Sequence, residues 1–230
     1  MRFLIAVLAV FYSLSLNAQQ ASSPDLPGAL RVQFGFNFLV DHPDSMSTGF
    51  WGSKALNAHY LYAVRLGESA FSINPGFGIA TDKFSFEENV TLERNIDGSI
   101  SIEPLEPLEY GEVKKTKLAT TYLEIPLELR FHFKKDNFKK SIKLSVGGKA
   151  GVLLSSHTKV NYKYLGENLK MKNKDNFNLN RFRYGLQATL GVAGISGYFY
   201  YALNDMFEKG EGPEETTASQ MQAGIAISVF

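Results

Sequence analysis

Seven charged side chains in the second half of the chain have the types and spacing that chemistry in a confined space requires. Four of them share even-numbered positions in one alternating stretch, and the other three lie in the two alternating stretches that follow. The set is Glu124, Glu128, Arg130, His132, Lys143, Lys149 and Arg183. Opposite charges held together away from water form networks of ion pairs and hydrogen bonds, and a titratable histidine among them can pass protons. The sequence therefore predicts either a structural polar plug or, as the alternative, a proton or ion path.

Other kinds of site are poorly supported. The four histidines fall on separate segments, without the spacing of a zinc or calcium site, so no metal and no cofactor is predicted. Asp41, His42 and Ser45 could serve a lipid-modifying enzyme at a membrane surface, but Ser and Asp in an exposed loop are more often turn formers. The glycine-rich run 147–151 lacks the strand-loop-helix setting of a phosphate loop. The chain is therefore predicted not to be an enzyme.

The elements that must position the seven charges are strands. From Leu30 to Phe38 every even position is apolar and every odd position is small or polar, and the same alternation recurs to the end of the chain. A strand with this pattern suits lipid on one side and a polar interior on the other. The clearest example, at about 118–133, places Glu124, Glu128 and Arg130 on the face opposite its leucines and phenylalanines. A soluble lipocalin-like barrel, which would bury its apolar face inward, is the alternative fold.

Eight such strands can be placed, and the connections between them alternate in length. Their approximate ranges are 29–40, 54–66, 70–86, 118–133, 141–154, 181–193, 195–203 and 218–230. Outer-membrane barrels have short periplasmic turns and longer outside loops, so the long connections, about 41–53, 87–117, 155–180 and 204–217, are expected outside. The third strand changes phase at Phe84 and Phe86, which predicts a bulge near Asp82. The long connection after it is expected to hold a hairpin around residues 97–98.

Composition and the N-terminus narrow the class further. Residues 1–18 combine one basic residue, a short apolar run and small residues before Gln19, as a secretory signal peptide does. Residues 19–28 are then a short periplasmic segment, and 29–230 form a single domain. The chain has no cysteine, 24 basic and 23 acidic residues, which excludes disulfides and argues against nucleic acid as a partner. The predicted partners are the outer-membrane lipid bilayer and other outer-membrane proteins.

The predicted long loops carry aromatic residues that a partner protein could contact. Phe50 and Trp51 precede the second strand, and Met206 and Phe207 follow the seventh. The chain ends in Phe230, like the terminal aromatic residue through which barrel-assembly machinery recognises its clients, although this residue is one position out of phase with the apolar face of the last strand.

Several motifs in these strands resemble a known family. They are Phe50-Trp51-Gly52-Ser53-Lys54, Asn74-Pro75-Gly76-Phe77-Gly78, Leu123-Glu124-Ile125-Pro126-Leu127-Glu128, Gly147-Gly148-Lys149-Ala150-Gly151 and Tyr201-Ala202-Leu203-Asn204-Asp205-Met206-Phe207. The chain thereby resembles, over about residues 30–230, the Bacteroidota outer-membrane β-barrel family that includes PorT, which is linked to type IX secretion. The resemblance implies an all-β, eight-stranded antiparallel transmembrane barrel in the bacterial outer membrane. It also implies an accessory or structural role in an outer-membrane assembly, with a small porin or a lipid-modifying enzyme as alternatives.

Overall fold

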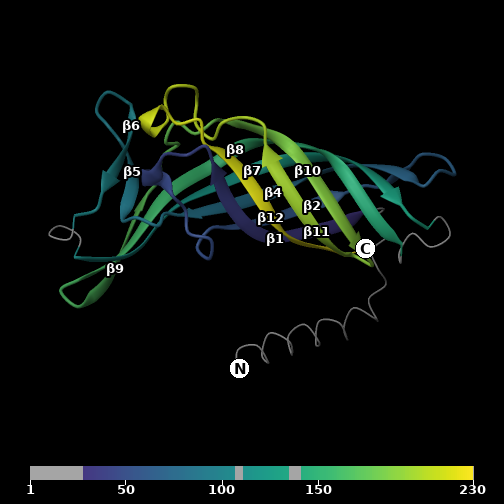
Figure 1. Ribbon diagram of the computed structural model, residues 1–230, viewed down its shortest axis with the longest axis horizontal. Coiled ribbons are helices and arrows are strands. Elements are labelled where there is room, and N and C mark those ends of the chain that lie inside the picture. The colour runs from purple at the N-terminus through teal and green to yellow at the C-terminus, as the bar shows by residue number, and fades with distance from the viewer. Residues whose placement is uncertain (1–27, 107–110, 135–140, 230) are drawn as a thin grey trace.

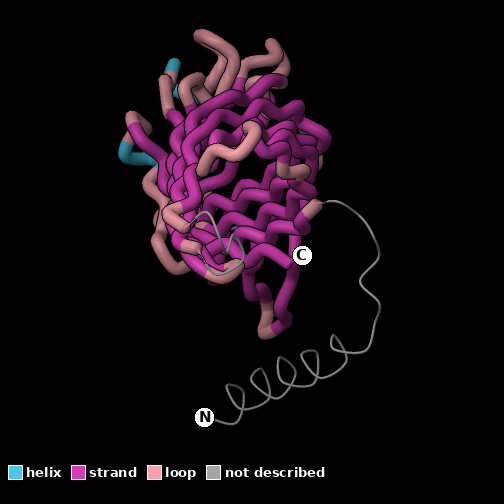
Figure 2. The backbone as a smooth tube through the Cα atoms, turned by 90° about the vertical axis from the view of Figure 1, so that its right-hand side faces the viewer, coloured by secondary structure: helices cyan, strands magenta, loops and turns pink. Residues whose placement is uncertain are grey.

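The computed structural model describes residues 28–106, 111–134 and 141–229. Eight long antiparallel strands form the body of the molecule (Figure 1). They are β1 (Ala29–Val40), β2 (Lys54–Leu61), β4 (Phe71–Ser85), β7 (Glu112–His132), β8 (Ile142–Tyr164), β10 (Phe182–Val192), β11 (Ile195–Ala202) and β12 (Ser219–Val229). Each strand pairs with its neighbour in this order, and β12 pairs back onto β1, so the sheet closes into a barrel. The predicted eight-stranded antiparallel barrel is confirmed (Figure 2).

The barrel turns its apolar residues outward. Along β1, Leu30, Val32 and Phe34 are exposed while Arg31 and Gln33 are buried, and the other strands repeat this alternation. Ile125, at the middle of β7, is 65% exposed. A soluble barrel would bury these side chains, since each one removed from water contributes about 1.5–3 kcal/mol. The lipocalin-like alternative is therefore wrong, and the outer surface suits the hydrocarbon of a membrane.

Close strand packing explains Gly147 in the glycine-rich run of β8. A Cβ added to Gly147 would lie 2.1 Å from the carbonyl oxygen of Leu127 and 2.7 Å from the Cα of Glu128 on the neighbouring strand β7. No side chain fits there without moving the backbone, so glycine at this position allows the backbones of the two strands to pack closely.

The two ends of the barrel differ in their connections. At one end, β10 and β11 are joined by a two-residue turn in which Ala193 and Gly194 both have positive φ, as a type I′ hairpin requires. We call this the turn end; it also holds the short strand β3 (Val64–Arg65) and both ends of the described chain. The opposite end, the loop end, carries the long connections. These contain the short helices η1 (Asp44–Met46) and η2 (Pro213–Glu215) and the hairpin of β5 (Val90–Arg94) and β6 (Ile100–Pro104).

Two of the strands extend far beyond the rest of the barrel at the loop end. β7 has 21 residues and β8 has 23, although 9–11 residues suffice to cross a bilayer. Their outer halves continue as an arm, to which β9 (Glu167–Asn173) adds a third strand (Figure 1). The ranges predicted for these two strands, about 118–133 and 141–154, do not include this extension.

The phase change in the third strand has a different cause from the predicted one. The pairing of β4 with both neighbours keeps a constant register through Asp82, so the predicted bulge is wrong. Phe84 and Phe86 instead stay on the inward face, where they are buried. They join an apolar cluster, which we call the cap, that lies across the loop end of the barrel. The cap consists of Leu39, Met46, Phe84, Phe86, Val90, Leu92, Ile100, Leu118, Phe177, Leu179 and Phe207.

No helix within the described residues is long and apolar enough to cross a membrane. The signal-peptide segment 1–18, most of the segment 19–28 and the terminal Phe230 lie outside the described residues.

Candidate functional site in the barrel interior

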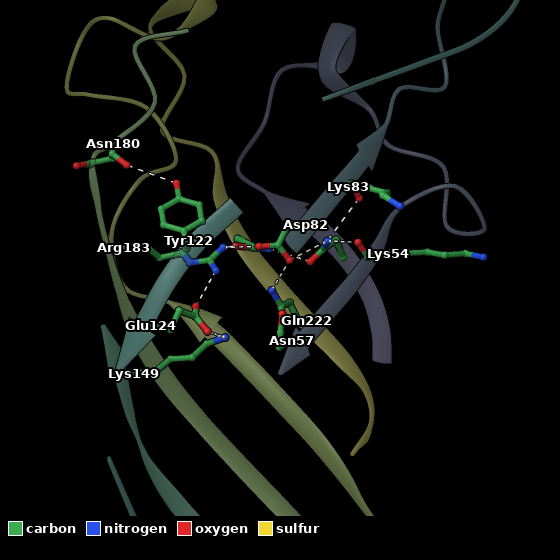
Figure 3. A network of polar contacts seen from close by, with 12 residues as sticks. Lys54, Asn57, Asp82, Lys83, Tyr122, Glu124, Lys149, Asn180, Arg183 and Gln222 are labelled. Carbon is green, nitrogen blue, oxygen red and sulfur yellow. Dashed lines mark hydrogen bonds and ion pairs between the residues drawn. The ribbon is translucent and has the colours of Figure 1, made fainter. Parts of the chain in front are cut away.

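A network of ionised and polar side chains fills the middle of the barrel, centred on Arg183 of β10 (Figure 3). Its guanidinium donates to Asp82 Oδ2 of β4 at 2.6 Å and to Glu124 Oε1 of β7 at 2.7 Å, and also to Gln220 of β12. The same group lies over the ring of Tyr122, 4.0 Å from its centroid. Arg183 therefore bridges two buried carboxylates, Asp82 and Glu124, across the barrel interior.

Glu124 is the second centre of this network, and it is 1% exposed. Besides Arg183, it contacts Lys149 Nζ of β8 at 3.2 Å and His59 Nε2 of β2 at 2.9 Å. Lys149 in turn lies 3.9 Å from the ring centroid of Tyr200 on β11. A buried carboxylate is stable only when donors surround it, and three basic side chains do so here.

Neutral amides complete the network around Asp82. Asn37 of β1 donates to Asp82 Oδ1 at 3.2 Å, and Gln222 of β12 donates to the same oxygen at 2.9 Å. With these contacts the network touches every one of the eight barrel strands. It therefore cross-links the barrel wall through its interior, where a polar chain of this kind rigidifies the fold.

A second cluster lies nearer the turn end and carries an excess of positive charge. Glu128 of β7 pairs with Arg31 of β1, and its Oε2 lies 3.3 Å from Arg130 Nη2. Arg130 also donates through Nε to the Ser145 hydroxyl at 3.1 Å. Lys143 lines the cavity beside these residues.

Two small cavities lie among the described residues of the barrel interior. A cavity of about 30 Å³ lies beside Arg31 and Arg130 at the turn end, and one of about 10 Å³ lies beside Tyr122 and Arg183 below the cap. Volumes of this kind hold about one or two water molecules. These two cavities share no lining residue, and the apolar cap lies across the loop end above them.

All seven charges named from the sequence lie on the inward face, but in two groups. Glu124, Lys149 and Arg183 meet in the central network, and Glu128 with Arg130 forms the cluster near the turn end. His132 and Lys143 lie at the turn end, where Ser72 contacts His132 Nε2 at 3.3 Å.

Sequence reasoning missed Asp82, His59, Asn37 and Gln222 as members of the network. A signal existed, because each lies on the polar face of an alternating strand. His59 was considered only as one of four histidines on separate segments, as a possible metal ligand. No group of three or more potential metal ligands occurs in the described part of the chain.

The aromatic residues named as possible partner contacts fall into two environments. Phe50 stacks on Phe36 at 4.2 Å between ring centroids, and Trp51, which is 78% exposed, meets both rings edge-on. Phe36 lies at the loop end of β1, so this cluster suits the membrane interface. By contrast, Phe207 is 1% exposed within the cap, and Met206 packs against the cap. A buried Phe207 offers a partner no surface.

An ion pair outside the barrel ties the β5–β6 hairpin to the connection before β10. Arg94 donates to Asp175 through Nε at 2.7 Å and through Nη2 at 3.2 Å, and this hydrogen bonding is the main cause that lowers the pKa of the Asp175 carboxyl. A carboxyl whose pKa is lower in the folded state stabilises that state above its ordinary pKa, and loses this contribution as the pH falls through the folded-state value.

We therefore expect acid, and not alkali, to loosen the hairpin. Amide hydrogen exchange of residues 90–104 should accelerate as the pH falls below about 4, the ordinary pKa of an aspartate, after correction for the intrinsic rate. The variant Asp175→Asn should show the faster exchange already at neutral pH and little further change in acid. An Asp175→Asn hairpin that retains the acid response of the wild type would contradict this assignment.

The outward apolar surface, the closed ring of strands and the polar interior define a transmembrane β-barrel of the outer-membrane class. Over residues 17–208 the chain matches the family described as outer membrane protein beta-barrel domain, and it belongs to that family. The protein is thus located in the bacterial outer membrane. Barrels of this class carry their long loops outside and their short turns in the periplasm, so we expect the loop end to face the outside.

Comparison with solved structures adds distant similarities. The attachment invasion locus protein Ail of Yersinia pestis, in complex with the heparin analogue sucrose octasulfate, shares 11% identity over 89% of this chain and 100% of that chain, with a TM-score of 0.36. A mutant of Rh. blastica porin shares 9% identity over 88% of this chain and 98% of that chain, with a TM-score of 0.20. At these scores neither similarity supports an argument about function. No curated protein matches the chain significantly.

Proposed function

We propose that this barrel is a non-catalytic accessory or structural subunit of a larger outer-membrane protein assembly. The observation that carries the proposal is the closed interior: the central network links all eight strands, and the cap covers the loop end. In a barrel whose lumen is filled, the outer wall and the loops are the surfaces that can contact other molecules. Protein export of the type IX kind, or barrel assembly, is the leading setting, and it rests on the resemblance to the PorT family.

Two features of the loop end suit contact with another protein. A groove of about 500 Å³ lies between the β5–β6 hairpin and the β8–β9 arm, with Glu93, Glu103 and Lys172 among the residues that line it. The arm itself projects beyond the barrel at the loop end (Figure 1). An arm of three paired strands can present a surface to another protein beyond the barrel.

The alternatives receive less support from the geometry. A solute-permeation barrel needs a continuous wet path, whereas the interior cavities hold only about one or two waters each. A lipid-modifying enzyme would need its nucleophile beside a base, yet the Ser45 hydroxyl donates to Glu214 at 2.8 Å while His42 Nδ1 contacts the Pro43 carbonyl.

The test is purification of the tagged protein from native outer membranes in mild detergent, with mass spectrometry of everything that co-elutes at a fixed ratio. We expect a stoichiometric set of secretion or assembly proteins. The same preparation should show no single-channel conductance in a planar bilayer. A lone barrel that conducts, with a selectivity that changes in Lys149→Gln or Glu124→Gln, would overturn the proposal in favour of a porin.

A further inference from the structure

The outward face of the protein carries a row of lysines that lies beyond the lipid-facing band and runs from the loop end of the barrel onto the base of the arm. The row crosses five neighbouring strands, β2, β4, β7, β8 and β9, with one lysine on each. We call it the lysine belt; it consists of Lys54, Lys83, Lys117, Lys159 and Lys172. The side chains of Lys54 and Lys83 point away from the interior network (Figure 3).

The belt brings like charges directly opposite one another. Lys54 pairs with Lys83 across β2 and β4, Lys117 pairs with Lys159 across β7 and β8, and Lys159 pairs with Lys172 across β8 and β9. Lys83 is diagonal to Lys117, since its direct partner is Ala119. Residues opposite one another have Cβ atoms about 4.5–5.5 Å apart, and like charges there destabilise the sheet.

The described part of the chain offers these lysines no carboxylate. None of the five forms an ion pair with a described residue, and no acidic residue occupies a cross-strand position opposite any of them. The protein as a whole is nearly neutral, with a formal charge of +1. The belt is therefore a local concentration of positive charge on one side of the barrel wall, and no described residue neutralises it.

Protection of a sheet edge does not account for the belt. Lysines on an edge strand prevent pairing with other chains, and this explains Lys172, because β9 pairs only with β8. The other four lysines lie on strands that are paired on both sides.

The aromatic cluster fixes the height of the belt relative to the membrane. Lys54 pairs directly with Phe36, the ring on which Phe50 and Trp51 pack, and its ammonium lies 5.9 Å from the ring centroid of the outward-facing Phe34. Trp and Phe clusters of this kind mark the boundary between hydrocarbon and headgroups. Leu56, two residues further toward the membrane on β2, is exposed on the same face. The belt thus begins where the headgroups of the outer leaflet begin.

We propose that the lysine belt binds the phosphate groups of the glycolipid in the outer leaflet. Clusters of Lys and Arg at a membrane surface recognise anionic lipid headgroups, and a row of ammonium groups on a β-sheet can contact phosphates from several neighbouring lipids. Bound phosphates turn the repulsion among the belt lysines into attraction. This inference does not depend on the proposed accessory role, because a barrel without protein partners is still surrounded by lipid.

The experiment uses the full-length protein in a neutral detergent, titrated with lipid A that carries both phosphates and, separately, with its dephosphorylated form. Trp51 is the only tryptophan, and it packs against Phe36, the cross-strand partner of Lys54, so its emission reports binding at this end of the belt. We expect tight, salt-sensitive binding of the phosphorylated form only. The variant Lys117→Gln/Lys159→Gln should bind it about 25-fold more weakly, at about 5-fold per lysine.

The matched comparison is Lys134→Gln/Lys209→Gln, which removes the same charge at the periplasmic end and in the loop after β11. This variant should bind as the wild type does, and Lys117→Arg/Lys159→Arg should keep most of the affinity. In neutral detergent without lipid, Lys117→Gln/Lys159→Gln should melt at a higher temperature than the wild type, because repulsion is relieved. Lipid A should then stabilise the wild type more than the variant.

Equal binding of the two lipid forms, or equal weakening by both double variants, would overturn the proposal. Binding of soluble polyphosphate with no preference for phosphorylated lipid would also overturn it, and would assign the belt to a soluble polyanion. A lower melting temperature of Lys117→Gln/Lys159→Gln in both conditions would assign the lysines a purely structural role.

Discussion

The substitution Arg183→Met should destabilise the barrel by roughly 3–5 kcal/mol, the usual cost of breaking a buried ion pair by removing one partner. Arg183 is buried and bridges Asp82 and Glu124, at 2.6 and 2.7 Å. Without it Asp82 keeps only amide donors, from Asn37 and Gln222. The measurement is the urea concentration at the midpoint of unfolding for the barrel embedded in lipid vesicles. Unfolding is followed by the difference in electrophoretic mobility between the folded and unfolded forms.

Two further variants make this expectation specific to charge. Arg183→Met/Asp82→Asn removes the stranded carboxylate while Asn keeps an oxygen for the amide donors, so it should recover a good part of the loss. Arg94→Met breaks the ion pair outside the barrel, in which both side chains are part exposed, and should cost less than about 1 kcal/mol. If the double variant is as unstable as Arg183→Met, lost packing against Tyr122 and not the uncompensated charge is the cause.

The substitution Phe84→Ala should open the cap while the barrel stays closed. Phe84 is 1% exposed among the apolar residues contributed by every long loop, and removal of a buried phenyl ring costs about 3–5 kcal/mol. The cost falls on the loops that the cap holds together. We expect amide exchange at Met46 and Leu179 to accelerate by roughly two to three orders of magnitude, at 1.4 kcal/mol per factor of ten.

Phe77→Ala provides the comparison on the same strand. Phe77 is 61% exposed on the outer wall, where lipid chains can fill the space left by the ring, so the cap amides should exchange at the wild-type rate. Exchange within β12 should stay slow in both variants. A general increase in exchange across the barrel in Phe84→Ala would mean that the cap and the barrel form one cooperative unit.

The fold could be predicted from the sequence because lipid and a polar interior impose one rule on every strand. The alternation from Leu30 to Phe38 needs no knowledge of the neighbouring strands, and the lengths of the connections order the strands around the ring. The first strand was predicted with the bounds that β1 has, and the hairpin around residues 97–98 is present as β5 and β6.

The same rule failed where the strands leave the membrane. It assigned Phe84 and Phe86 to the lipid face, since an apolar side chain on the inward face contradicts a polar lumen. Above the bilayer the inward face meets the loops, and there an apolar core becomes favourable. Alternation within one strand does not show where this change occurs. The isolated apolar residues in the loops, such as Met46 and Phe177, were the available signal.

The interior was only partly predictable for a related reason. Alternation identifies which side chains point inward, as for Glu124 and Lys149, but the contacts across the lumen depend on the shear of the barrel. Asp82 and Arg183 are 101 positions apart in the sequence, and they meet because the ring closes at one register.

Closure also imposes an order in time. The barrel closes where β1 pairs with β12, and this pairing joins Leu30 to Val229, almost the first and last described residues. Gln222 on β12 supplies one of the hydrogen bonds to Asp82. While the polypeptide is still being delivered to the periplasm, Arg183, Glu124 and Asp82 have no enclosed space in which to meet, and the edges of β1 and β12 are open to other chains. Contacts between such distant residues form slowly. In a partly exported chain these charged side chains are therefore hydrated and the edges of the strands are unpaired. The network can assemble only after the last strand has arrived.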